Sequence, residues 1–318
     1  MRIVFWGTPE FATPPLRALI GEGFDVVAVV TQPDRPRGRS RSQLDPSPVK
    51  AVAMEEGIAV LQPEKPRGAE FVQAMRDLAP DLSVVVAYGH ILPREVIELP
   101  RLGTLNIHAS LLPRLRGAAP IQAAIADGFA ETGVSIMRMV PALDAGPVIH
   151  ALSTPIEPDE TGGELTLRLS ELGATALIEA LALMELGEAR EQAQDDTQVT
   201  YAQKIEREHA RVDWTLDAEA VARRIRAYDP KPGAWSVLHG LEVRLFGAKG
   251  VPGAQGQQGQ QGQQGAPGTT LATADHALVI ACGRGAISVR DVHPSGKRRM
   301  SAQDWLKGRG ATVGDRWE

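Results

Sequence analysis

Three polar side chains in one part of the sequence could together catalyse acyl transfer to an amine. Asn106 and His108 stand two residues apart in NIHASLLPRLRG (106–117), and Asp144 follows in LDAG (143–146). An amine that attacks an acyl carbon creates an oxyanion, which needs hydrogen-bond donors, and an ammonium group, which must lose a proton to a base. The amide and the imidazole supply donors and the carboxylate supplies a base, so this chemistry requires no nucleophilic Ser or Cys.

The spacing of Asn106 and His108 places them on one face of an extended strand, because alternate side chains of a strand point the same way. We expect His108 in its protonated form to stabilise the oxyanion, with Asn106 donating a second hydrogen bond. A nearby Asp144 carboxylate would favour the charged imidazole and accept the proton of the attacking amine, directly or through water. The residues alone also allow a core histidine at 108 and a simple turn residue at 144.

Apolar runs alternate with helical patterns at the start of the chain. Strand-like runs occupy residues 1–7, 26–30 and 82–87, and a helical pattern with Leu16 and Leu19 lies between the first two. This alternation predicts an α/β domain with a doubly wound, Rossmann-like parallel sheet. Ligands of such sheets bind beyond the carboxyl ends of the strands. The first turn lacks Gly-x-Gly-x-x-Gly, which argues against a dinucleotide site.

The remainder of the sequence predicts a second, smaller domain, as the length of 318 residues also favours. A helical pattern over 164–187 ends the first domain, and a polar, acidic segment follows it. Beyond residue 211 a helical pattern precedes short apolar runs separated by glycines and prolines, which is typical of a small, OB-like β-barrel. The expected organisation is a catalytic domain at 1–189, a linker at 190–208 and a barrel domain at 209–318.

Two features of this second part have simple structural interpretations. Residues 256–265 repeat Gly-Gln-Gln and offer no apolar side chain to a core, so they are expected to form a loop. We interpret this loop as an insertion without a function rather than as an RNA contact. The single cysteine, Cys282, lies in an apolar run and is expected in a strand. One cysteine excludes an intrachain disulfide and a cysteine-based metal site.

Composition and charge narrow the class of protein. The sequence is 43% hydrophobic, no run reaches the roughly 18 apolar residues that a membrane span needs, and it begins in a strand-like run without a signal pattern, so a cytoplasmic protein is expected. Residues 1–189 hold 16 Lys and Arg against 24 Asp and Glu, whereas residues 190–318 hold 18 against 15. The resulting net charges, −8 and +3, sum to −5. Such asymmetry is compatible with a nucleic-acid-binding part and with an ordinary surface.

A basic segment between the second apolar run and residue 46 carries four arginines on a Gly- and Ser-containing loop. They are Arg35, Arg37, Arg39 and Arg41. A solvated charged loop is one interpretation, and a flexible segment that orders on the phosphates and bases of RNA is the other. The cluster at 297–299 could add phosphate contacts or be an ordinary surface cluster.

The residues of several motifs, and the order of these motifs along the chain, resemble those of the folate-dependent formyltransferases. Within that group, they resemble those of the methionyl-tRNA formyltransferase family. The resemblance extends along nearly the whole chain. The motifs are GTPEFA (7–12), QPDRP (32–36), PSPVK (46–50), AYGHILP (87–93), NIHASLLP (106–113), RGAAPIQ (116–122), ETGV (131–134) and MSAQD (300–304).

The resemblance implies the partners and the binding residues. The formyl donor would be 10-formyltetrahydrofolate, the acceptor would be initiator methionyl-tRNA, and no metal would take part. The basic segment would contact the tRNA, with Arg39 matching the key arginine of the family. His90 departs from the aliphatic residue of the family pattern, and the basic segment is about one residue longer. The expected folate-binding residues are Tyr88, Gly89, His90, Ile91, Leu92, Ser110, Leu111, Leu112 and Pro113.

Several alternatives remain open at this level. A formyltransferase for a small amine such as an amino sugar, and a hydrolase of formyltetrahydrofolate, would use the same three residues. The basic segment and the barrel domain favour the tRNA enzyme. Retention of all three residues together argues against a folate- or RNA-binding module without catalysis. His90, His108, His150 and Asp144 have no recognisable metal-ligand spacing, and a monomer is expected.

Overall fold

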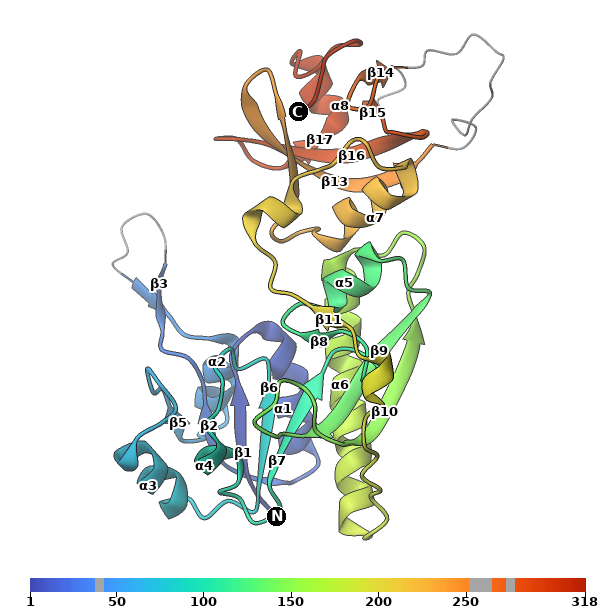
Figure 1. The fold of residues 1–318 in the computed structure, drawn as a ribbon. Helices are drawn as coiled ribbons and strands as arrows, with labels where there is room; N and C mark the ends of the chain where they lie inside the picture. Colours follow the sequence, from blue (N-terminus) through green and yellow to red (C-terminus); the bar gives the residue numbers. More distant parts are fainter. Residues whose placement is uncertain (38–42, 252–264, 273–277) are drawn as a thin grey trace. The chain divides into compact units, whose positions relative to one another are not determined.

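Figure 1 shows the fold of a computed structural model, which describes residues 1–37, 43–251, 265–272 and 278–318. The chain divides into two compact units, and neither is one continuous stretch of sequence. The first unit comprises residues 1–117, 132–154 and 166–202, and the second comprises residues 118–131, 155–165 and 203–318.

The first unit is built on a seven-stranded sheet in the order β10-β9-β7-β6-β1-β2-β5. Strands β7, β6, β1, β2 and β5 are parallel to one another, and β9 pairs with β7 in the antiparallel sense. The predicted doubly wound sheet is therefore confirmed. The strands are β1 (Arg2–Gly7), β2 (Asp25–Val30), β5 (Val60–Leu61), β6 (Leu82–Val86), β7 (Thr104–His108), β9 (Glu131–Arg138) and β10 (Val148–Pro155).

Apolar side chains on both faces explain why this sheet is buried. Val4 and Trp6 of β1 pack in one cluster with Val72 and Val96, which come from helices α3 and α4. Ile3 and Phe5 alternate with them and are equally buried. The helices of this unit are η1 (Glu10–Ala12), α1 (Thr13–Gly21), α2 (Pro48–Glu55), α3 (Ala69–Asp77), α4 (Arg94–Ile97), α6 (Gly162–Glu185, with its first turn in the second unit) and η2 (Asp196–Gln198).

Two short strand pairs accompany the main sheet. Strands β3 (Arg35–Arg37) and β4 (Gln43–Asp45) form an antiparallel ribbon, where the sequence suggested a loop. Strand β8 (Arg116–Gly117) pairs in parallel with β11 (Tyr201–Ala202). The second pair connects the candidate catalytic segment with residues late in the first unit.

The second unit contains a curled antiparallel sheet in the order β12-β13-β16-β15-β14, with β17 also paired to β16. The predicted small β-barrel type of domain is confirmed. Its core includes Trp214, Ile225, Leu245, Ile287 and Trp305. The elements are β12 (Ala234–Leu238), β13 (Leu241–Gly250), β14 (Thr270–Ala272), β15 (Leu278–Ala281), β16 (Ala286–Pro294), β17 (Met300–Ser301), α5 (Pro120–Ala126), η3 (Arg207–Ala210), α7 (Ala218–Ala227) and α8 (Ala302–Lys307).

Some details of the second unit differ from the expectations. Cys282 directly follows β15 instead of lying within it, and burial raises the pKa of its thiol to about 12. Arg299 pairs with Asp229 and Asp291 and lies over the ring of Phe246, so this member of the 297–299 cluster stabilises the unit itself. Most of the Gly-Gln-Gln tract (256–264) lies outside the described residues. Within the described ranges, no helix is both long and apolar enough to cross a membrane.

Candidate active site

Strand β7 presents Asn106 and His108 at the carboxyl edge of the parallel strands. Asn106 lies opposite Val85 of β6, and His108 lies opposite Ser135 of β9. Ile107 alternates to the other face, where it packs beside Gly173 of α6. The helix therefore covers the face that carries Ile107, and the two polar side chains point away from it.

His108 and Asp144 come together in this unit. The Nδ1 atom of His108 lies 3.7 Å from Oδ2 of Asp144, and the side chains are only 6% and 15% exposed. The Nε2 atom lies 2.9 Å from the carbonyl oxygen of Leu115. Because a carbonyl can only accept, Nε2 must carry a proton. Nδ1 is therefore the ring nitrogen that faces the carboxylate, across a gap slightly longer than a hydrogen bond.

The carboxylate of Asp144 is aimed by the backbone around it. The amide of Gly117 donates a 2.8 Å hydrogen bond to Oδ2. Asp144 itself has a φ of 47°, in the left-handed region that non-glycine residues rarely occupy. Gly146 and Gly117 allow close chain approaches, because a Cβ atom would collide with the carbonyl oxygens of Arg138 and Ala202, respectively. The turn is thus tightly specified.

The carboxamide of Asn106 makes no hydrogen bond to any residue that the structure describes. It is half-buried and lies one pleat from His108. A half-buried amide with free donors can stabilise a negative charge that develops beside it. The edge of the sheet thus offers an available donor, an imidazole and a carboxylate, which is the set that amine acylation requires.

The predicted folate segment 88–92 has a mixed environment. The side chains of Tyr88 and Leu92 pack in the apolar core, so they face away from solvent, whereas Ile91 is 89% exposed and His90 is also exposed. The Tyr88 hydroxyl has no partner among the described residues, and burial raises its pKa to about 12. Tyr88 and Leu92 can therefore contact a ligand only through their main chains.

Hydrogen bonds also fix the predicted folate residues 110–113. The hydroxyl of Ser110 donates to the carbonyl oxygen of Arg114 at 2.6 Å. The hydroxyl of Ser135 donates to the carbonyl oxygen of Ser110 and accepts from the amide of Leu112. Ser110 is buried, and Leu111, Leu112 and Pro113 are half-buried. A rigid segment with partly exposed apolar side chains suits a flat aromatic ligand.

The basic segment is described only in part. Arg35 and Arg37 lie in β3, whereas Arg39 and Arg41 lie outside the described residues. The main-chain register pairs Arg35 with Asp45 and Arg37 with Gln43. Strands β3 and β4 thus form the base of a hairpin, and β3 carries Arg35 and Arg37.

A polar network around Lys50 holds the residues that lead into this hairpin. The Lys50 ammonium donates to Asp34 at 2.5 Å and to Gln62 at 2.7 Å. Gln62 in turn donates to the other carboxylate oxygen of Asp34 and to the carbonyl oxygen of Gln32. Hydrogen bonds from Lys50 and Gln62 lower the pKa of the Asp34 carboxyl. Ser47 caps helix α2, so PSPVK is a helix start that places Lys50 beside QPDRP.

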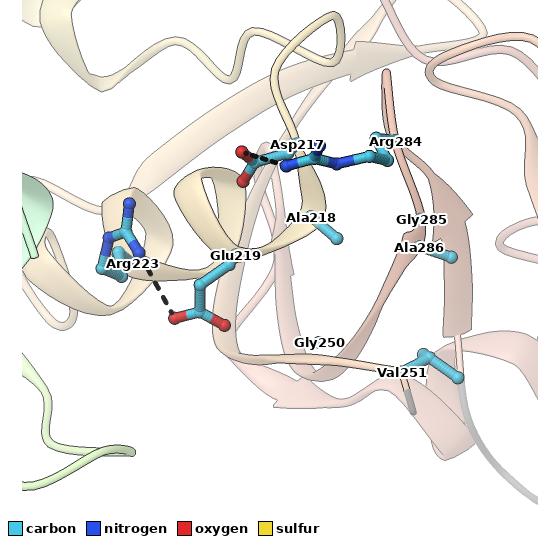
Figure 2. Close-up of a pocket in the computed structure, with 9 residues that line it drawn as sticks. All are labelled: Asp217, Ala218, Glu219, Arg223, Gly250, Val251, Arg284, Gly285 and Ala286. Carbon is cyan, nitrogen blue, oxygen red and sulfur yellow. Dashed lines mark hydrogen bonds and ion pairs between the residues drawn. The ribbon is translucent and has the colours of Figure 1, made fainter. Parts of the chain in front are cut away.

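A cavity of about 360 Å³ lies in the second unit, at the start of α7 (Figure 2). Arg284 pairs with Asp217, and Arg223 pairs with Glu219 at its rim. None of the predicted site residues lines this cavity. Among the described residues, no group of three or more His, Cys, Asp and Glu side chains is arranged to hold a metal ion.

Comparison with protein families gives two matches that together cover most of the chain. Residues 1–181 match the family model described as formyl transferase. Residues 204–310 match the model described as formyl transferase, C-terminal domain. Residues 182–203 lie between the two matches.

Individual relatives agree with these matches. A methionyl-tRNA formyltransferase of Methylococcus capsulatus is 49% identical over 306 residues, which cover 96% of each chain. The solved methionyl-tRNA formyltransferase of Clostridium thermocellum has a TM-score of 0.58 at 16% identity, covering 80% of this chain and 95% of that one. HypX of Aquifex aeolicus in complex with tetrahydrofolic acid has a TM-score of 0.64 at 23% identity, covering 98% of this chain. This chain spans 48% of HypX.

Proposed function

Because the chain belongs to the formyl transferase family, we propose that it transfers a formyl group from 10-formyltetrahydrofolate to the amino group of methionine on initiator methionyl-tRNA. The observation that carries this function is the 49% identity to a methionyl-tRNA formyltransferase over 96% of both chains. The geometry of Asn106, His108 and Asp144 supports it, because these groups meet the chemical needs of amine acylation.

The proposed mechanism assigns one role to each of the three groups. The methionine amine attacks the formyl carbon, and the carbonyl oxygen becomes an oxyanion. The Asn106 amide and the protonated His108 stabilise this charge. Asp144 takes the proton of the new ammonium group, directly or through water. The same proton passes to N10 as the bond between N10 and the formyl carbon breaks, so the intermediate collapses to formylmethionyl-tRNA and tetrahydrofolate and the carboxylate is restored. His108 keeps its orientation because Nε2 donates to Leu115.

The binding roles follow from the surroundings of these residues. Residues 88–92 and 110–113 border the proposed folate site, with Gly89 and its neighbours offering backbone groups and Ile91 offering an exposed apolar side chain. Arg35, Arg37, Arg39 and Arg41 contact the tRNA in this proposal. The ranges 1–189, 190–208 and 209–318 act as catalytic domain, linker and tRNA-binding domain. The protein acts as a monomer in the cytoplasm, where its acceptor enters translation.

The test is transfer of labelled formyl from 10-formyltetrahydrofolate to methionine-charged initiator tRNA. Charged elongator tRNA, free methionine and a small amino sugar serve as alternative acceptors. Formylation of the initiator species alone establishes the reaction and its selectivity. Consumption of the donor without formylated tRNA identifies a hydrolase, and formylation of the sugar identifies a small-amine enzyme. Either of the last two results contradicts the proposal.

Binding of the two substrates should differ in its salt dependence. Arginine contacts with tRNA phosphates release counterions, so affinity for methionyl-tRNA should fall at least about tenfold between roughly 50 and 200 mM salt. Affinity for the folate should change by less than about threefold, because apolar and backbone contacts are weakly screened. Titrations of each substrate over this range measure both slopes. Equal slopes would contradict a phosphate-contacting basic segment.

Loss of the Lys50 network should weaken tRNA binding selectively. We expect Lys50→Met to raise KM for methionyl-tRNA about tenfold, since it removes a partly buried ion pair that anchors the hairpin base. KM for the folate should stay within about twofold. Lys65→Met, at an exposed site, is the matched control. Asp34→Asn should reproduce the effect, because removing a carboxylate cannot remove a phosphate contact. A normal KM for tRNA in both network variants would refute this anchoring role.

A further inference from the structure

Residue Gln194 lies beside the Asp144 turn, in a segment that neither family match covers. Its Nε2 atom donates to the carbonyl oxygen of Asp144 at 2.8 Å and to that of Gly146 at 2.7 Å. One side chain therefore binds the main-chain carbonyl groups of the residues before and after Ala145. The turn contains the left-handed Asp144, a conformation that persists only where surrounding contacts enforce it.

The orientation of the Gln194 amide is determined by its partners. Its Oε1 atom accepts a 2.9 Å hydrogen bond from Nε of Arg116, and the Arg116 side chain is buried. A guanidinium can only donate and two carbonyls can only accept, so a flipped amide would face three repulsive contacts. The amide thus uses both of its N–H groups on the turn and its oxygen on Arg116.

Arg116 and its neighbours in the chain also contact the candidate catalytic residues. The residue after it, Gly117, donates its amide to Oδ2 of Asp144. The carbonyl and the hydroxyl of Thr200 accept from the amides of Arg116 and Leu115. Leu115 is the residue whose carbonyl holds His108. Gln194 therefore connects the turn that carries the carboxylate with the segment that orients the imidazole.

We propose that Gln194 is a positioning residue, which fixes the Asp144 turn so that the carboxylate faces His108. It acts on the reaction only through Asp144, and its kinetic role rests on the function proposed above. The signal for it is absent from the local sequence, because Gln194 lies 50 residues from Asp144 and 78 residues from Arg116. Gln194 lies in the range assigned to the linker, within the stretch 166–202 that belongs to the first compact unit.

The first arm of the test measures the turn itself, without any substrate. Amide hydrogen exchange should rise in peptides covering 115–118 and 143–147 of Gln194→Ala, because the clamp on the turn is lost. Gln194→Glu should behave similarly. One carboxylate oxygen would stand where the Nε2 donor stands in the wild type, and it would repel the two carbonyl oxygens of the turn. Gln198→Ala is the matched control, because within the described part of the chain the Gln198 side chain bonds only to the neighbouring Asp195. Unchanged exchange in both Gln194 variants would overturn the clamp.

The second arm measures catalysis. We expect kcat for methionyl-tRNA formylation to fall roughly 10- to 100-fold in both Gln194 variants, the range for small displacements of a catalytic group. KM for both substrates should stay near that of the wild type. Raised exchange with normal kcat would leave Gln194 a structural residue and refute the positioning role. A wild-type protein without formylation would refute the proposed function instead, while the exchange arm still decides whether the clamp exists.

Discussion

Replacing Asp144 with Asn is expected to lower kcat for formyl transfer by about 1,000-fold, within the range for loss of a general base. The amide of Asn cannot accept the proton of the attacking amine, because it has no basic oxygen like that of a carboxylate. Gly117 could still donate to the Asn oxygen, so the turn should keep its shape. Single-turnover rates measured with charged initiator tRNA would report the chemical step directly.

The same variant should bind the folate with an affinity within about twofold of the wild type, because the carboxylate acts mainly in the transition state. Asp25→Asn is a matched control, since Asp25 forms an exposed ion pair with Arg2. If Asp144→Asn retained near-normal turnover, the carboxylate could not be the base. A large loss of folate affinity with a normal rate of the chemical step would show that Asp144 binds the folate and does not act as the base.

Replacing His108 with Ala should lower kcat by roughly 100- to 1,000-fold, the cost of losing one preorganised donor to an oxyanion. The imidazole is almost buried and its Nε2 atom is held by the carbonyl oxygen of Leu115, so the ring is preorganised in the free protein with Nδ1 left for the oxyanion. KM for methionyl-tRNA should change little, because the charge that His108 stabilises develops only during the reaction. Rates at saturating substrate measure this effect.

Two further variants make this second prediction specific. His150→Ala is the control, because His150 pairs with Glu179 and belongs to the same sheet. Asn106→Ala should show a comparable loss if both donors face the oxyanion. A normal rate in His108→Ala with a large loss in Asn106→Ala would assign the oxyanion to the amide alone.

The sequence by itself determined the sheet and the pair on β7. Hydrophobic patterning is a local property, so continuous apolar runs were enough to predict β1, β2 and β6, and a spacing of two was enough to place Asn106 and His108 on one face. The order of the motifs also indicated the family, through their resemblance to known formyltransferases. These features depend on residues that are close together in the sequence, so the sequence alone is enough to predict them.

Only the tertiary structure decided which groups surround the candidate catalytic residues. Leu115 engages one nitrogen of His108, Asp144 stands opposite the other, and Gln194 clamps the turn from 50 residues away. The burial of Tyr88 and Leu92 likewise depends on helices packed over the sheet. Hydrogen bonds between distant residues leave no periodic trace in a sequence. They exist because folding brings those chain segments within about 3 Å of one another.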